Sequence, residues 1–329
     1  MSVRPVLLTI PRWLQTAIGV ALTTGVAVVA FGLVALPPFF RTLHPDVEPS
    51  AAAIAARAEQ LWMASADVIA DTKIAAGLMP DTAAARRDAL LGDDVTPLVT
   101  TLGSIEAKRL TLSPRWAGVI AGQLVAKGIR RGDFVTASFS GSFPALNLAV
   151  ISACEAIGAP LVAVSSVTAS TWGANQPGFT WPEMEARLAA EGALQAVSVA
   201  VSAGGAGDRA LDLDDQGRRL ALGIAERSAG RLGAVLLAPV SLSDAIDARL
   251  AIFDRHRNGR PIAAFINVGG TEASLGASTA ILTVTSGWIP PAPFDTSPGR
   301  GLVARMAERG VPVLHLLNVR DLAARWGLL

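Results

Sequence analysis

Cysteine, histidine and lysine are scarce in this sequence, and each scarcity removes a class of functional site. The 329 residues include a single cysteine, Cys154, so neither an intramolecular disulfide nor a zinc site of several thiolates is available. The apolar neighbours of Cys154 favour a thiol packed in the core over a nucleophile. The histidines His44, His256 and His315 are too scattered for a histidine-rich metal motif, and we predict no metal site.

Charge is also sparse, since charged residues make up 17% of the chain and the net charge is +1. Lysine occurs only at Lys73, Lys108 and Lys127, and no long basic run is present. Nucleic-acid-binding proteins usually concentrate basic residues in a patch or stripe, so the composition argues against nucleic acid as a partner. By contrast, hydrophobic residues reach 51% and the mean hydropathy is +0.44, which is high for a purely soluble protein.

The excess of apolar residues is concentrated near the N-terminus. No charged residue occurs between Arg12 and Arg41, and the stretch WLQTAIGVALTTGVAVVAFGLVALPPFF lies between them. It exceeds the roughly 20 residues that a helix needs to span a bilayer. It is also longer than the apolar core of a cleavable signal peptide, about 7–15 residues. We therefore predict an uncleaved transmembrane helix at about residues 13–38.

The charges that flank this segment predict its orientation. Arg4 and Arg12 precede it, whereas Asp46 and Glu48 follow closely after Arg41. Because positive residues favour the cytoplasmic side, we expect a single-pass protein of the inner (cytoplasmic) membrane with its N-terminus inside and its body outside the cytoplasm. The lipid bilayer is thus an expected partner. We divide the chain into a membrane segment (1–48), a linking helix with an irregular connector (49–98) and an α/β domain (99–329).

The α/β domain is predicted from apolar runs that alternate with helical patterns. Strands are expected at 134–140, 160–166, 194–202, 260–270 and 311–318. Continuous runs of Val, Ala and Leu between helices are typical of parallel strands covered on both faces. We predict a doubly wound, mostly parallel sheet with helices on both faces. In such sheets ligands bind beyond the carboxyl ends of the strands, where the strand order reverses.

The loop after the first clear strand is the richest in possible chemistry. Ser140, Gly141 and Ser142 precede Pro144 in the segment SFSGSFPALNLAV. Small residues at a helix N-terminus leave backbone N–H groups free, and with the helix dipole these suit a carboxylate or a phosphate. The plainer alternative is that Ser142 only caps the helix that Pro144 opens. Both interpretations stay open at this stage.

A catalytic serine is a further alternative for the same loop. The segment fits neither the G-x-S-x-G elbow nor the Gly-Lys-Ser/Thr end of a P-loop. Ser140 or Ser142 as a nucleophile would need a base, and histidine is scarce. Glu106 or Lys108 would serve as the proton-transfer group only if the fold brings one of them near.

Other polar stretches follow or precede the remaining strands. VTTLGSIEAKRLTLSPRWA contains Glu106, Lys108 and Arg109, while GANQPGFTWPE and the segment NVGGTE have the composition of turns. The GGAG run at 204–207 lacks the full G-x-G-x-x-G spacing, so no cofactor follows from it. The residues that we expect to bind a ligand are Lys108, Arg109, Ser140, Gly141, Ser142, Asn175, Asn267, Gly269, Gly270, Thr271 and Glu272.

Four of these stretches, in their order along the chain, resemble the poly-γ-glutamate system protein family. The matching segments are TTLGSIEAKR, SGSFPALNLA, STWGANQPGFTWPEME and FINVGGTEASLG, within residues 55–290. The resemblance implies a place in the machinery that makes and exports the poly-γ-glutamate capsule polymer of bacteria, with its synthase or export complex as a partner. It implies no particular reaction and no catalytic residue.

The resemblance and the residues together leave three functions open. The first is a membrane-anchored accessory protein that binds the anionic polymer, a small anionic precursor or the synthase. The second is a γ-glutamyl hydrolase or transferase with a serine nucleophile, and the third is a nucleotide or sugar-phosphate binding protein suggested by the fold class alone. A polyanion calls for backbone N–H groups and a few Arg or Lys side chains, and the Ser140–Ser142 and Asn267–Glu272 loops with Lys108 and Arg109 offer both.

Overall fold

The computed structural model describes residues 49–277, 284–289 and 300–329. The predicted transmembrane helix at 13–38 lies outside the described residues. Within the described residues, no helix has both the length and the apolar character needed to cross a bilayer. Ser50–Leu329 forms one compact unit.

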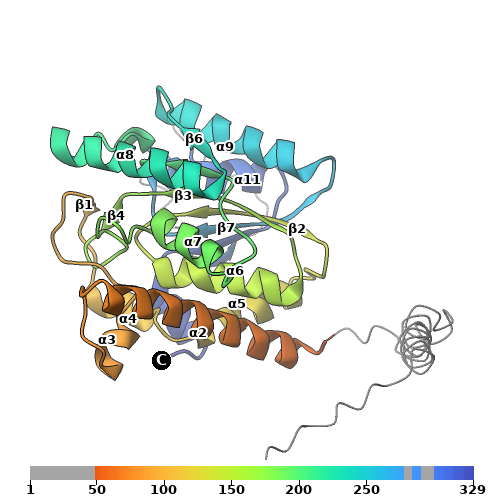
Figure 1. Ribbon diagram of the computed structural model, residues 1–329. Helices are drawn as coiled ribbons and strands as arrows, with labels where there is room; N and C mark the ends of the chain where they lie inside the picture. The colour runs from red at the N-terminus through yellow and green to blue at the C-terminus, as the bar shows by residue number, and fades with distance from the viewer. Residues whose placement is uncertain (1–48, 278–283, 290–299) are drawn as a thin grey trace, which may run out of the picture. The chain divides into compact units, whose positions relative to one another are not determined.

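A mostly parallel sheet of seven strands, in the order β6-β5-β3-β2-β7-β9-β8, forms the centre of this unit (Figure 1). Its strands are β2 (Phe134–Phe139), β3 (Leu161–Ser166), β5 (Ala200–Ser202), β6 (Val235–Leu237), β7 (Ile262–Val268), β8 (Gly287–Ile289) and β9 (Val313–Leu316). Within it, β8 pairs antiparallel with β9 and the other neighbours pair in parallel. The expected α/β class with a mostly parallel sheet is confirmed. A separate two-stranded sheet pairs β1 (Val99–Thr101) with β4 (Ala169–Ser170).

Helices cover both faces of the large sheet. Alternate residues of the central strands point to opposite sides, and in β2 and β3 the residues on both sides are buried. Val135, Ala137 and Phe139 of β2 belong to one core cluster, whereas Phe134 belongs to another. The longer helices are α2 (Ala51–Ala75), α5 (Arg115–Ala126), α6 (Pro144–Ile157), α7 (Trp181–Ala190), α8 (Asp215–Leu232) and α9 (Leu242–Arg257). The shorter ones are α3 (Ala83–Arg87), α4 (Ile105–Leu110), α10 (Glu272–Leu275), α11 (Leu302–Glu308), α12 (Val319–Arg325) and the 3-10 turn η2 (Ala206–Asp208). Figure 1 shows α2, α5 and α6 on one side of the sheet and α8, α9 and α11 on the other.

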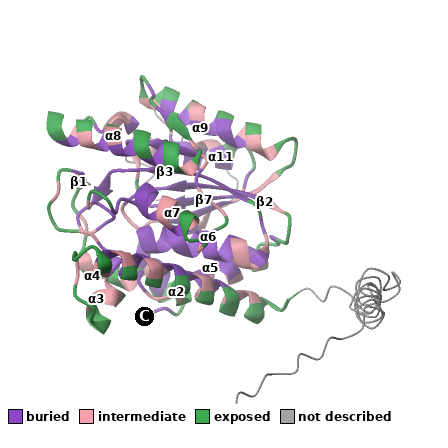
Figure 2. Ribbon diagram, in the orientation of Figure 1, coloured by how far each residue is buried: buried purple, intermediate pink, exposed green. Residues whose placement is uncertain are grey.

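Helix α2 is part of this packed unit, although the sequence suggested a linking helix. Ser50 caps it, since its Oγ accepts a hydrogen bond from the Ala53 amide at 3.2 Å. Trp62, which is 5% exposed, packs in the core cluster that α5 and α6 share, and its indole N–H donates to the Ala145 carbonyl at 2.9 Å. Figure 2 shows that α2 is exposed along its outer side only. The apolar face of α2 is therefore part of the core of the α/β unit.

The strand expected at 194–202 is shorter in the structure, and side chains explain why. The amides of Gln195 and Ala196 donate to the Glu155 carboxylate at 2.7 and 2.8 Å, and the Ser198 amide donates to Glu185 at 2.9 Å. Backbone groups that bond to carboxylates cannot join a ladder, so β5 begins only at Ala200. A second difference is α3, which lies in the connector within 49–98 that we predicted to be irregular.

The strand order reverses between β2 and β7. From β2 the chain moves outward through β3, β5 and β6, and it then returns to the other side of β2 to form β7 and β9. The carboxyl ends of β2 and β7, which are followed by the segments that begin at Ser140 and Gly269, therefore flank the position at which doubly wound sheets bind ligands.

Candidate functional site

A pocket of about 220 Å³ opens at this reversal of strand order. It is lined by Thr100, Thr101, Ser140, Ser142, Thr168, Gly205, Ala206, Asp212, Gly270, Thr271 and Glu272. These residues come from the ends of β1, β2, β3, β5 and β7 or from the loops that follow them. Five of the residues expected from the sequence to bind a ligand lie among them: Ser140, Ser142, Gly270, Thr271 and Glu272.

The loop after β2 is held in shape by its own polar groups. The Ser142 amide donates to Ser140 Oγ at 3.0 Å, and Asn147 in α6 donates from Nδ2 to the Ser140 carbonyl at 2.8 Å. Gly141 has no room for a side chain, because a Cβ would lie 2.8 Å from the Thr168 carbonyl oxygen. Ser142 Oγ accepts a hydrogen bond from the Ser170 amide at 3.1 Å, so its own O–H group stays available to a ligand.

The loop after β7 lies directly against the loop after β2. Gly269 has a φ of +83°, and a Cβ there would lie 2.4 Å from Ser140 Oγ. Only glycine meets both conditions, since other residues rarely adopt this backbone region. Thr271 then caps the short α10, with its Oγ1 accepting from the Ser274 amide at 3.2 Å. The Gly270 amide donates a hydrogen bond to no residue in the described part of the chain.

The third wall of the pocket is the glycine-rich loop after β5, which the sequence pattern did not mark as part of a site. Gly204, Gly205 and Gly207 all have positive φ. The Ala206 amide donates to Asp212 Oδ1 at 2.9 Å, and the Gly207 amide donates to the Glu272 carboxylate. The GGAG run thus forms one wall of the pocket. The high density of glycine in this run was the signal in the sequence that could have identified it as part of a site.

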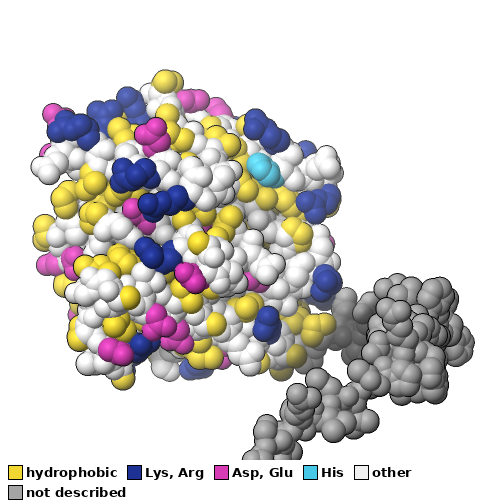
Figure 3. Space-filling view, in the orientation of Figure 1, with side chains coloured by type: hydrophobic (Ala, Val, Ile, Leu, Met, Phe, Trp, Pro, Cys, Tyr) yellow, Lys and Arg dark blue, Asp and Glu magenta, His cyan; other side chains and the backbone are white. Residues whose placement is uncertain are grey.

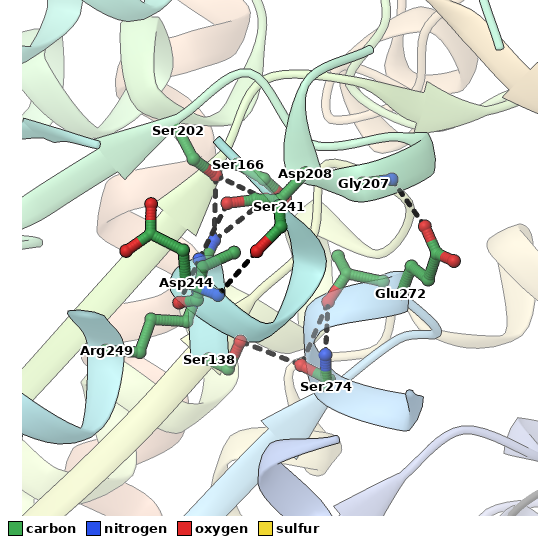
Figure 4. A network of polar contacts seen from close by, with 12 residues as sticks. Ser138, Ser166, Ser202, Gly207, Asp208, Ser241, Asp244, Arg249, Glu272 and Ser274 are labelled. Atoms are coloured by element: carbon green, nitrogen blue, oxygen red, sulfur yellow. Dashed lines mark hydrogen bonds and ion pairs between the residues drawn. The ribbon is translucent and has the colours of Figure 1, made fainter. Parts of the chain in front are cut away.

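A buried ion pair fixes this third wall to α9. Arg249 donates from Nη1 to Asp208 Oδ2 at 2.6 Å and from Nη2 to Oδ1 at 2.9 Å. Nη2 also donates to Ser202 Oγ at 2.8 Å. Figure 4 shows these side chains pointing toward one another, with Glu272 reaching Gly207 beside them. Asp208 has a φ of +62°, so the pair holds a loop with an unusual backbone next to the pocket.

Lys108 lies beneath the β2 loop rather than in the pocket. Its ammonium donates to the Ser142 carbonyl and, at 2.7 Å, to Ser170 Oγ. Burial lowers the pKa of Lys108 to about 7, because the charged form is poorly solvated there. The Phe143 ring, with its centroid 3.8 Å from Nζ, favours the charged form and works against that shift. Lys108 therefore ties β4 to the β2 loop and contacts the backbone, not the hydroxyl, of Ser142.

The remaining expected residues do not join the pocket. Glu106 is 68% exposed and faces Arg320 at 3.9 Å, and Arg109 pairs with Asp88 at 3.0 Å beside a different pocket of about 240 Å³. Asn175 is buried and fixes the chain near Asp93, whose amide donates to its Oδ1 at 2.9 Å.

Asn267 is also buried, at the end of β7. Its Nδ2 donates to the Gly269 carbonyl at 2.8 Å and lies 2.9 Å from His315 Nδ1. Burial lowers the pKa of His315 to about 4, so the imidazole is neutral at neutral pH and can accept from Asn267. Asn267 therefore shapes the loop that carries Gly269 and Gly270.

The charges that line the pocket are negative. Asp212 and Glu272 supply carboxylates, and the other lining residues are Gly, Ala, Ser and Thr. The face of the molecule in Figure 3 shows Lys and Arg side chains distributed among acidic, apolar and neutral groups. The pocket thus combines hydroxyl and amide donors with two carboxylates, which suits a small polar ligand with groups of both signs.

Comparison with protein family models, with curated proteins and with solved structures finds no match for this chain.

Proposed function

We propose that this protein is a membrane-anchored accessory protein of poly-γ-glutamate synthesis or export that binds the polymer or its precursor in the pocket between the β2 and β7 loops. The observation that carries the proposal is the meeting of two segments on which the family resemblance rests. Ser140 and Ser142 come from one segment, and Gly270 to Glu272 from the other, and they line a single pocket. The pocket also lies where a sheet of this topology binds ligands.

The hydrogen bonds of the two serines support binding over catalysis. A serine nucleophile needs a base within hydrogen-bond reach of its hydroxyl. Ser140 Oγ and Ser142 Oγ instead accept from backbone amides, while Lys108 contacts the Ser142 carbonyl and Ser170. A phosphate ligand is less well supported, because the carboxylates of Asp212 and Glu272 line the pocket and would repel it.

The membrane anchor belongs to the same proposal. A charge-free run of this length before the α/β unit favours a single-pass protein of the inner membrane. With the α/β unit on the extracytoplasmic side, the pocket would meet the polymer during or after export. The synthase or export complex would then be the partner that brings polymer and pocket together.

Two measurements on the full chain in detergent test this function. Isothermal titration calorimetry with γ-glutamyl oligomers should detect binding that Ser142→Ala weakens by a graded amount, about 10- to 100-fold for one lost hydrogen bond to a carboxylate. The same oligomers, incubated with the protein and assayed for new amino ends, should stay intact. Release of amino ends that Ser142→Ala or Ser140→Ala abolishes would replace this proposal by the hydrolase.

A further inference from the structure

The negative lining of the pocket conflicts with a simple polyanion site, and that conflict identifies the part of the ligand that fits. Inside a γ-glutamyl chain each unit offers a carboxylate and amide groups but no positive charge. Asp212 and Glu272 would repel such a unit. The amino end of the chain is different, because its first unit carries an ammonium beside its α-carboxylate. Free glutamate carries the same head group.

The two carboxylates are fixed so that one oxygen of each is available to a ligand. Asp212 Oδ1 accepts from the Ala206 amide at 2.9 Å, and Glu272 Oε2 accepts from the Gly207 amide. The other oxygens, Oδ2 and Oε1, make no hydrogen bond to any described residue. An ammonium has three donors and can pair with both carboxylates, of which Glu272 is half-buried and Asp212 is exposed at the rim.

Donors for the ligand's own carboxylate lie in the same pocket. Thr168 is 4% exposed, and in the described part of the chain its hydroxyl has no partner although it lines the cavity. The Thr168 hydroxyl oxygen reaches the cavity, so its O–H group is available to donate to a ligand atom there. The Ser142 hydroxyl and the Gly270 amide, which also donate to no described residue, face the same space.

We propose that this pocket recognises an α-amino acid head group, with Asp212 and Glu272 holding the ammonium and Thr168, Ser142 and the Gly270 amide holding the carboxylate. The inference rests on the proposed function and narrows its ligand to the free amino end of a γ-glutamyl chain or to free glutamate. Thr168, Asp212 and Gly205 to Gly207 thereby become specificity-determining residues that the sequence did not single out. The ion pair between Asp208 and Arg249 positions the loop that carries Ala206 and Gly207.

The test compares a γ-glutamyl pentamer with the same pentamer acetylated at its amino end, by calorimetry on the full chain in detergent. Acetylation removes the ammonium and keeps the carboxylates, so we expect binding to weaken by about 10- to 100-fold. Glu272→Gln and Asp212→Asn should remove most of that difference. Both substitutions keep an oxygen that accepts the Ala206 or Gly207 amide and delete only the charge. Asp215→Asn, an exposed carboxylate outside the lining, is the matched control and should change nothing.

The possible results separate the two proposals. Equal binding of free and acetylated pentamers would overturn the head-group inference and leave the accessory function standing. Absence of binding by both pentamers and by glutamate would overturn the proposed function as well. If the pentamer binds more tightly than free glutamate, the ligand is the amino end of the polymer. If the two bind with equal affinity, the head group of a single glutamate accounts for all of the binding.

Discussion

Arg249 shows how much one side chain contributes to the third wall of the pocket. Its guanidinium is 2% exposed and pairs with Asp208, which is 1% exposed, in a two-point contact. Such a pair gains little net stability over apolar packing, but removing one partner leaves the other charge buried and uncompensated. The geometry of the Gly205–Gly207 loop thus depends on a residue that lies 41 positions from Asp208 in the sequence.

Arg249→Met should destabilise the protein by about 3–5 kcal/mol, because Asp208 then lies buried without a counter-charge. The double variant Arg249→Met with Asp208→Asn should recover a large part of that loss, and Asn tolerates the positive φ at this position. Urea denaturation of the four members of this cycle measures the effect. Arg257→Met in the same helix breaks an exposed ion pair and should cost less than about 1 kcal/mol. A double variant as unstable as the single one would show that charge burial is not the cause.

Lys108 should make the free energy of unfolding depend on pH above neutrality. Burial lowers its pKa from 10.5 to about 7 in the folded protein. Between these values the unfolded chain binds a proton that the folded chain does not, so stability rises with pH by up to about 1.4 kcal/mol per unit. Below about pH 7 the penalty for the buried ammonium is present in full. Lys108→Met should reduce this rise. Part of it remains, because burial also lowers the pKa of Lys73, to about 8.

Urea denaturation at about pH 6, 7.5 and 9 measures that difference, and Lys127→Met is the control because Lys127 is exposed. The same slope in the Lys108→Met variant and in the parent protein would mean that Lys108 stays charged in the fold. The Phe143 ring is the group that could keep it so.

Among the elements, α2 is the one whose role the packing redefines. Its buried stripe includes Ala58, Trp62, Ser65 and Ile69, and it packs against α5 and α6. Spacing of three or four residues predicts such a stripe in any amphipathic helix. The tertiary contacts, among them the hydrogen bond from Trp62 to the first turn of α6, show which surface the stripe covers.

Trp62→Phe should lower the free energy of unfolding by about 0.5–1.5 kcal/mol, because the Ala145 carbonyl loses the indole donor but keeps its partner within α6. Trp62→Ala should cost more, about 3–5 kcal/mol, since it adds a cavity to the lost hydrogen bond. Chemical denaturation compares both variants with Met63→Ala, whose side chain is 44% exposed and should change stability by less than about 0.5 kcal/mol. A neutral Trp62→Ala would mean that α2 is only loosely attached.

At the scale of the whole molecule, the proposal predicts a single crossing of the inner membrane with the α/β unit outside the cytoplasm. A reporter enzyme that is active only outside the cytoplasm, fused after Leu329, should therefore be active in intact cells. The control is a second fusion with a reporter that is active only inside, which should be silent. The reverse pattern would place the pocket on the side where the polymer is synthesised and would favour precursor binding over export.

The sequence by itself determined the class of fold and the location of two pocket loops. Runs of Val, Ala and Leu with helices between them predict parallel strands, and the Ser-Gly-Ser and Gly-Gly-Thr-Glu segments stand directly after two of those strands. These signals are local, because each depends on side-chain periodicity or on residues that few other conformations accept. They can therefore be recognised along the chain without knowledge of the neighbours of any strand.

Only the tertiary structure decided which loops meet and what charge they enclose. Strand order brings the ends of β2 and β7 together, adds the β5 loop as a third wall, and turns Glu106 and Arg109 away to solvent. Lys108 likewise ends beneath the pocket, so the predicted cationic cradle became a site with two carboxylates. The Ser-Gly-Ser loop lies at the carboxyl edge of the sheet as predicted, but the charge of the residues around it depends on long-range packing, which no local pattern in the sequence encodes.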